Sequence, residues 1–141
     1  MKDQVLSIEQ MQELQELGVD TSKASCCWCK LVSSNRIGYA WLLLPESLNK
    51  MDETHVPTFT LQDILETLPK YIEVTEEQTD KSEYLGTNRL RIGCPEGIDD
   101  MYIMYTKDSK MNGGWSSFNA KPSLIKAAFN MLKWCKENNY I

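Results

Sequence analysis

The sequence predicts an α+β fold, with three helices packed on an antiparallel sheet of about five strands in the approximate order αββαβββα. Three segments repeat apolar residues at helical spacing, at 8–17, 61–68 and 124–135. Between them lie short apolar or alternating runs bounded by turn residues, a pattern typical of strands. The 141 residues, 42% of them hydrophobic, suit a single domain spanning 1–141.

The first two helices have clear start signals. Ser7 and Gln10 form the S-x-x-Q pattern of a capping box, and Gly18 supplies a stop. Thr60 is placed to cap the second helix, with Asp63 at its third position. These signals predict helices that begin just after Ser7 and just after Thr60.

The last helix begins near Pro122, where a missing N–H has no cost. Lysines lie toward its C-terminal end, where the helix dipole favours cations. A broad apolar face predicts that it packs on the sheet, and this face consists of Leu124, Ile125, Ala128, Phe129, Met131, Leu132 and Cys135.

The five predicted strands span 25–32, 37–44, 71–74, 84–92 and 101–106. Residues 33–36 are expected to connect the first two as a hairpin, and Gly86 is expected to form a bulge in the fourth. The polar segment 46–58 contains the single histidine, His55, and is expected to be a surface loop. A hairpin turn at 112–114 is expected to lead the chain into residues 115–118.

The formal net charge of −5 disfavours a general nucleic-acid binder and an anionic membrane surface, because both are bound by clustered Lys and Arg. No apolar run reaches the length of a membrane span, and the N-terminal residues carry no apolar signal region. The five cysteines do not form a spaced disulfide framework. We therefore expect a cytoplasmic protein with reduced thiols and no membrane partner.

Cys26, Cys27 and Cys29 form the densest group of reactive side chains, and they are the weak candidates for a metal site. A zinc ion would need further ligands, and His55, Cys94 and Cys135 are the residues that could supply them. On a strand, however, Cys27 and Cys29 point to one face and Cys26 to the other. The favoured interpretation is that they are small core residues, with a structural metal or a redox pair as alternatives.

The sequence offers no converging catalytic groups. His55 stands alone in a polar segment, and the adjacent acids at 76–77 and 99–100 are typical of charged surface. Neither a glycine-rich phosphate loop nor a nucleophile motif occurs. We therefore expect a chain that is not an enzyme, with no catalytic residues, no cofactor and no metal.

The second half, from residue 60 onward, has the order helix, three strands, helix, which is also the order of double-stranded RNA-binding domains. In this alternative interpretation, Arg89, Arg91, Lys121 and Lys126 form a nucleic-acid-binding patch. Element order alone concerns fold rather than function. The acidic total charge opposes this alternative.

Several segments resemble a group of small uncharacterised proteins from Bacteroides that occur among phage-like or other mobile genes. The likeness covers both ends of the chain and its middle helix, in SIEQM (7–11), GVDTSKAS (18–25), FTLQDIL (59–65), LPK (68–70), LIKAAFNMLKWC (124–135) and ENNYI (137–141). The resemblance implies an accessory protein of a mobile element and supplies no activity or site residues.

Together these features favour a non-enzymatic domain that works by binding an unidentified protein partner or a second copy of itself. The first alternative is a nucleic-acid-associated domain that uses residues 60–141. The second alternative is a small enzyme or a zinc protein built around Cys26–Cys29.

Overall fold

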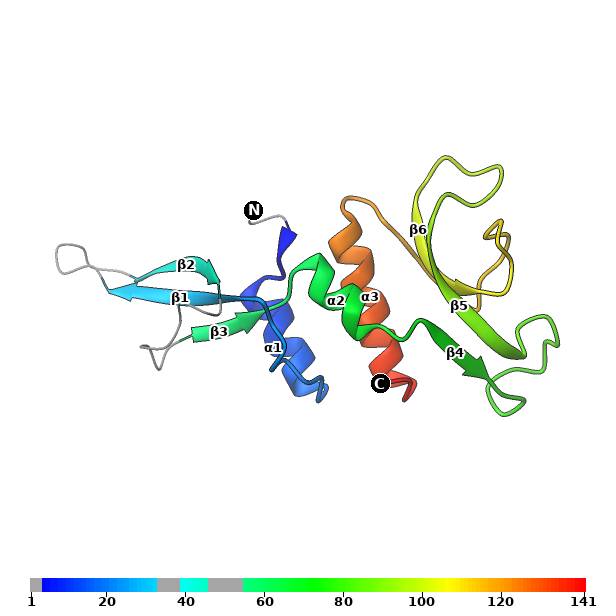
Figure 1. Ribbon diagram of the computed structural model, residues 1–141, viewed down its shortest axis with the longest axis horizontal. Helices are drawn as coiled ribbons and strands as arrows, with labels where there is room; N and C mark the ends of the chain where they lie inside the picture. The colour runs from blue at the N-terminus through cyan, green and yellow to red at the C-terminus, as the bar shows by residue number, and fades with distance from the viewer. Residues whose placement is uncertain (1–3, 33–38, 46–54) are drawn as a thin grey trace. The chain divides into compact units, whose positions relative to one another are not determined.

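The computed structural model describes residues 4–32, 39–45 and 55–141 (Figure 1). In these residues the order is αβββαββββα, with three helices and two antiparallel sheets of three and four strands. The predicted α+β class is confirmed, and the strands form two sheets, a point that the sequence left open. The chain divides into two compact units, Met1–Ile64 and Leu65–Ile141, which are described separately below. The prediction of a single domain stays a prediction.

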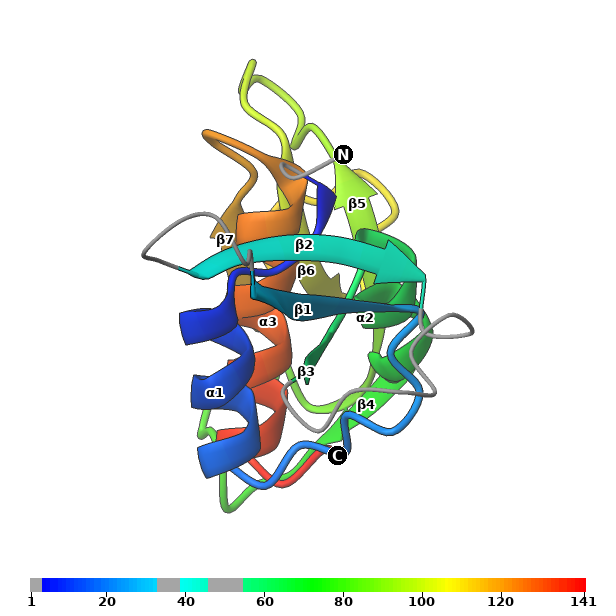
Figure 2. The same cartoon turned by 90° about the vertical axis from the view of Figure 1, so that its left-hand side faces the viewer.

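The first unit contains helix α1 and a three-stranded sheet. Helix α1 spans Ile8–Glu16, and the strands are β1 (Cys26–Val32), β2 (Tyr39–Pro45) and β3 (His55–Thr58). Strand β1 is central, and both neighbours pair with it in antiparallel register (Figure 2). The predicted connection at 33–36 lies outside the described residues.

Strand β3 was not predicted, because His55–Thr58 falls in the segment expected to be a surface loop. Its pairing explains the difference, since Val56 lies opposite Trp28 and His55 opposite Cys29 on β1. A proline inside a strand is tolerated at a sheet edge, and β3 is an edge strand. Residues 46–54 of the same predicted loop lie outside the described residues.

The start of α1 follows the predicted capping box. The Ser7 hydroxyl accepts a hydrogen bond from the Gln10 amide at 3.2 Å, and Gln10 Oε1 accepts one from the Ser7 amide at 2.9 Å. Residues before the helix extend the hydrogen bonding of the sheet. The carbonyl of Leu6 accepts bonds from Trp28 Nε1 (2.9 Å) and Thr58 Oγ1 (2.7 Å). These bonds satisfy two buried polar groups and fix the N-terminal segment in the core.

Helix α2 (Leu61–Thr67) begins with the second capping box. Thr60 Oγ1 accepts a bond from the Asp63 amide at 3.1 Å, and Asp63 Oδ2 accepts one from the Thr60 amide at 2.8 Å. The same carboxylate accepts bonds from the amide of Ser25, at 3.0 Å, and from its hydroxyl. Asp63 therefore joins the helix start to the residue preceding β1.

The second unit is built on a sheet of strands β4 (Tyr71–Val74), β5 (Gly86–Gly93), β6 (Tyr102–Thr106) and β7 (Ser116–Asn119). These strands lie in chain order, and every neighbouring pair is antiparallel. Helix α3 (Leu124–Glu137) packs on one face against β6 and β7. Instead of the expected bulge, Gly86 is the first residue of β5, with a φ of 90° that suits glycine.

Tyr105 and Cys135 join the sheet to α3 in the core of this unit. The Tyr105 hydroxyl donates to the Pro69 carbonyl at 2.6 Å, and Cys135 Sγ lies 3.7 Å from the same hydroxyl. Burial raises the pKa of Tyr105 far above its ordinary value and raises that of Cys135 to about 11. Both groups therefore remain protonated at neutral pH. Because Cys135 belongs to α3, the Tyr105 side chain points to the face of the sheet that α3 covers.

Candidate functional site

The cysteine cluster lies on the central strand of the first unit. Cys27 and Cys29 are buried, and their sulfur atoms are 3.4 Å apart. Cys26, the first residue of β1, is partly exposed. Their positions agree with the expectation that Cys27 and Cys29 share one face.

His55 lies opposite Cys29 in the β1–β3 register. Across the described ranges, no group of three or more His, Cys, Asp and Glu side chains is arranged to hold a metal ion.

The four basic residues of the proposed nucleic-acid patch do not share one surface. Arg89 and Arg91 lie opposite Thr106 and Met104, on the sheet face that α3 does not cover. Arg89 also lies over the Tyr71 ring, 5.5 Å from its centroid. These two side chains lie together on the open face.

Lys121 and Lys126 lie elsewhere in the second unit. Lys126 is an exposed residue of α3, the helix that covers the other face of the sheet. Lys121 forms an ion pair with Asp100, and this contact holds the pKa of Asp100 below its usual value while raising that of Lys121. The structure therefore separates the four cations into three places.

A loop between β6 and β7, residues 107–115, folds back over the open face of the sheet. Met111 is buried, and its sulfur is 3.2 Å from the point where a Cβ on Gly93 would lie. A Cβ on Gly114 would lie 3.2 Å from Met104 Cβ and 3.1 Å from the Tyr105 carbonyl. Glycine at these two positions allows the close approach of the loop, which we call the 107–115 loop.

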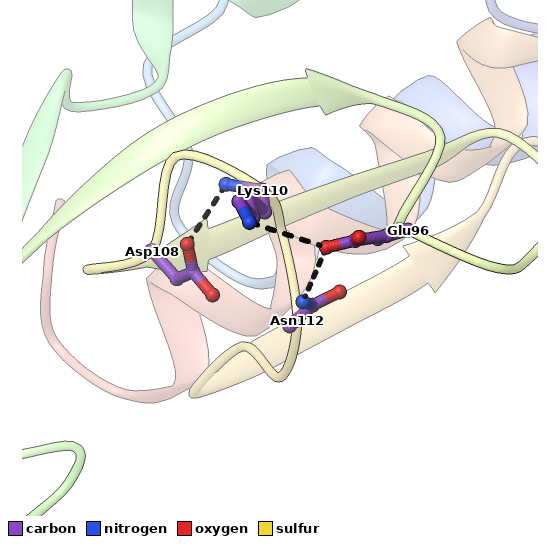
Figure 3. A network of polar contacts seen from close by, with 4 residues as sticks. All are labelled: Glu96, Asp108, Lys110 and Asn112. Atoms are coloured by element: carbon purple, nitrogen blue, oxygen red, sulfur yellow. Dashed lines mark hydrogen bonds and ion pairs between the residues drawn. The ribbon is translucent and has the colours of Figure 1, made fainter.

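A polar network fixes the 107–115 loop to the turn that follows β5 (Figure 3). Asn112 Nδ2 donates to Glu96 Oε2 at 3.1 Å, and Lys110 Nζ lies 3.7 Å from the same oxygen. The Glu96 amide donates to the Lys110 carbonyl at 3.3 Å, and Asp108 Oδ1 accepts a bond from the Lys110 amide at 2.8 Å. Two segments from opposite ends of β6 are thereby held together.

An apolar pocket of about 220 Å³ opens on one side of this loop. Its apolar walls come from Pro95, Ile98, Tyr102, Met104 and Met111. Beside it the side chain of Ile98 is 48% exposed, and the neighbouring Met101 is 44% exposed. Such side chains at the rim of a pocket are typical of a surface that binds another molecule.

A second pocket, of about 200 Å³, lies at the other side of the loop and has a polar lining. Its walls are formed by Glu83, Tyr84, Asn88, Thr106, Lys107, Asp108, Asn112 and Gly113. Asn112 and Gly113 line both pockets, so the tip of the 107–115 loop separates them. We take this pair of pockets as the candidate site.

The sequence predicted the turn at 112–114 but not the site to which it contributes. The glycines at 93 and 114, placed at the ends of strands, are the available signal, since such glycines often mark a close backbone approach. The pairing of Asn112 with Glu96 has no local signature, because the two residues are 16 positions apart.

The comparisons with known proteins add no relative: no family model matches the chain, and no curated protein or solved structure matches it either. Within the described part of the chain, the helices are too short or too polar to cross a membrane.

Proposed function

We propose that this chain is a non-enzymatic cytoplasmic accessory domain that binds a protein partner through the second unit. The binding surface consists of the turn at 94–101, the 107–115 loop and the two pockets on either side of that loop. The single observation that carries this proposal is the apolar pocket whose lining includes the exposed side chain of Ile98. The resemblance to mobile-element proteins supports an accessory role.

The chemistry of the apolar pocket favours binding over catalysis. Glu96, the carboxylate in its lining, is already bonded to Asn112 and Lys110. The methionine, isoleucine and proline side chains of the other walls offer contact area rather than a nucleophile or a base, and Tyr102 and Ser117 add hydroxyl groups. An apolar side chain of a partner would fill this pocket and displace weakly held water.

The charge around the pocket indicates what kind of partner fits it. Asp99, Asp100 and Glu96 lie on the turn, whereas Lys110 and Lys121 are each paired with one of these carboxylates. Three carboxylates against two lysines leave this edge acidic, in keeping with the net charge of −5. A partner segment that carries basic residues beside its apolar side chain would be complementary.

The test is capture of the partner by matched variants. Tagged wild type, Ile98→Glu and Ile141→Glu are used to capture proteins from the cells that naturally produce the chain, with and without nuclease. Ile141 is exposed and apolar but lies outside the pocket, so it controls for added charge. Circular dichroism checks that both variants are folded.

The proposal predicts a stoichiometric protein that wild type and Ile141→Glu retain and that Ile98→Glu loses at least ten-fold. Equal capture by all three forms would show that the pocket is not the binding surface. Recovery that requires intact nucleic acid would favour the alternative that uses Arg89 and Arg91.

A further inference from the structure

Strand β7 forms one edge of the sheet in the second unit, and part of its backbone points outward. The Ala120 amide donates to the Met101 carbonyl at 2.8 Å, which fixes the phase of the hydrogen bonds between β6 and β7. Along an antiparallel pair of strands, bonded and non-bonded residue pairs alternate. Ser117 and Asn119 therefore belong to non-bonded pairs, and their N–H and C=O groups point away from β6.

These outward groups have no backbone partner among the described residues, in which β6 is the strand that pairs with β7. Edge strands are often protected against further pairing by a charged residue or a proline. Strand β4, at the opposite edge, carries Glu73, whereas β7 consists of two serines, a phenylalanine and an asparagine. The edge formed by β7 therefore lacks this protection against an added strand.

The direction of the β7 side chains follows from a contact with α3. Ser116 Oγ donates to Met131 Sδ at 3.9 Å, so the Ser116 side chain faces the helix. By alternation, the side chains of Ser117 and Asn119 lie on the open face of the sheet. Ser117 is exposed and lines the apolar pocket, which places this pocket directly beside the edge strand.

The part of the pocket lining that comes from β7 and the residues before it is low. Gly113, Gly114 and Ser117 have little or no side chain, whereas the lining from β6 includes Tyr102 and Met104. In a bonded antiparallel pair, opposite residues lie on the same face with their Cα atoms about 5.5 Å apart. A long apolar side chain opposite Ser117 on an added strand would therefore pass over the serine into the pocket.

The other residue of an added strand on this face would lie opposite Asn119. Asn119 Nδ2 donates to the Asp100 carboxylate at 3.2 Å. Lys121 pairs with Asp100, and the adjacent Asp99 is exposed. A basic side chain opposite Asn119 is complementary to this acidic turn. In an antiparallel added strand, that basic residue comes two positions before the apolar one.

We propose that the partner binds as an extended segment that adds an antiparallel strand to β7. This inference rests on the proposed function and gives its mode of recognition. The backbone groups of Ser117 and Asn119 hold the segment, and the spacing of a basic and an apolar residue selects it. Every neighbouring pair in this sheet is antiparallel, so the added strand continues the same pattern.

The first test uses a synthetic probe, the peptide acetyl-Thr-Arg-Val-Leu-Thr-Thr-amide, in which arginine lies two positions before leucine. Two further peptides carry one N-methyl group, either on the leucine nitrogen or on the valine nitrogen. In the proposed register the leucine N–H points to β7, whereas the valine N–H points away from it. The two methylated peptides have the same composition and differ in the predicted bond.

Binding is followed by ¹H–¹⁵N NMR on the whole chain. We expect the unmodified peptide to shift the amide signals of Ser117 and Asn119 saturably and to slow their hydrogen exchange. Methylation at leucine should weaken binding at least five-fold, and methylation at valine less than two-fold. The inference is overturned if the unmodified peptide gives no saturable shift, if exchange of both amides is unchanged, or if both methyl groups weaken binding alike.

The second test removes an outward donor from the chain itself. Ser117→Pro deletes an N–H that β6 does not use, and proline is tolerated at such edge positions. Ser117→Ala keeps the N–H and is the matched control. We expect Ser117→Pro to lose the captured partner at least five-fold relative to Ser117→Ala. Circular dichroism checks that Ser117→Pro is folded, and the methylated peptides decide the question if it is not.

The same capture separates this inference from the proposed function. Loss of the partner with Ile98→Glu but not with a folded Ser117→Pro would leave the proposed function standing and overturn the added strand. Peptide binding at β7 without any captured partner that depends on Ile98 would instead count against the proposed function.

Discussion

The side-chain amide of Asn112 donates a hydrogen bond to the Glu96 carboxylate at 3.1 Å and thereby joins the two segments that form the candidate site (Figure 3). Glu96 follows β5, whereas Asn112 lies on the loop that follows β6. With the backbone bond from Glu96 to Lys110, this contact holds the wall between the two pockets.

Asn112→Ala should loosen that wall with little effect on the rest of the fold. Both side chains are exposed, so their bond adds at most about 1 kcal/mol to the free energy of unfolding. Hydrogen exchange at Lys110 and Met111 should accelerate several-fold, and partner affinity should fall. Asn130→Ala, on α3, is the control. Unchanged exchange in Asn112→Ala would show that backbone bonds alone hold the loop.

Asp63→Ala should destabilise the first unit by about 2–3 kcal/mol, because it removes an acceptor that the Ser25 and Thr60 amides share. Urea unfolding of the whole chain measures this loss. Gln12→Ala, at an exposed position of α1, should stay within about 0.5 kcal/mol of wild type. A loss for Asp63→Ala as small as for Gln12→Ala would mean that the carboxylate is dispensable.

Asp100 should titrate at a lower pH than an ordinary aspartate, because Lys121 donates a hydrogen bond to its carboxylate. A carboxyl whose pKa is lower in the folded state stabilises that state above its unfolded pKa. The contribution is lost as the pH falls through the folded pKa. Carboxyl ¹³C NMR should show the Asp100 midpoint rising in Lys121→Ala and staying unchanged in Lys107→Ala. An Asp100 midpoint that is the same in Lys121→Ala as in wild type would contradict the ion pair.

The cysteines should differ widely in their reaction with iodoacetamide at neutral pH. Cys94 is exposed, whereas Cys27 and Cys135 are fully buried and the pKa of Cys135 is raised to about 11. Because the thiolate is the reactive form, Cys94 should be modified first and the two buried thiols only in denaturant. Peptide mass spectrometry measures each site. Native labelling of Cys27 at the rate of Cys94 would mean that β1 opens readily.

Local signals in the sequence predicted the helices well, because caps act within one turn of the chain. Both capping boxes, Ser7 with Gln10 and Thr60 with Asp63, form the expected bonds. The bond from Ser25 to Asp63 could not be predicted, since the two residues lie 38 positions apart. It depends on the placement of β1 beside the start of α2.

Strand β3 and the candidate site were missed for the same physical reason. His55–Thr58 is polar and contains a proline, so pairing with β1 rather than local preference makes it a strand. The pockets likewise exist only because the 107–115 loop folds back across the sheet. Contacts between distant segments leave little trace in the pattern of either segment alone.

Hydrogen–deuterium exchange on the chain alone and with its captured partner tests the proposed binding surface most directly. The proposed surface predicts protection in peptides that cover 94–102 and 107–115, and little change in 4–29. Protection confined to 4–29 or to the exposed side of α3, with none in 94–102 and 107–115, would contradict it.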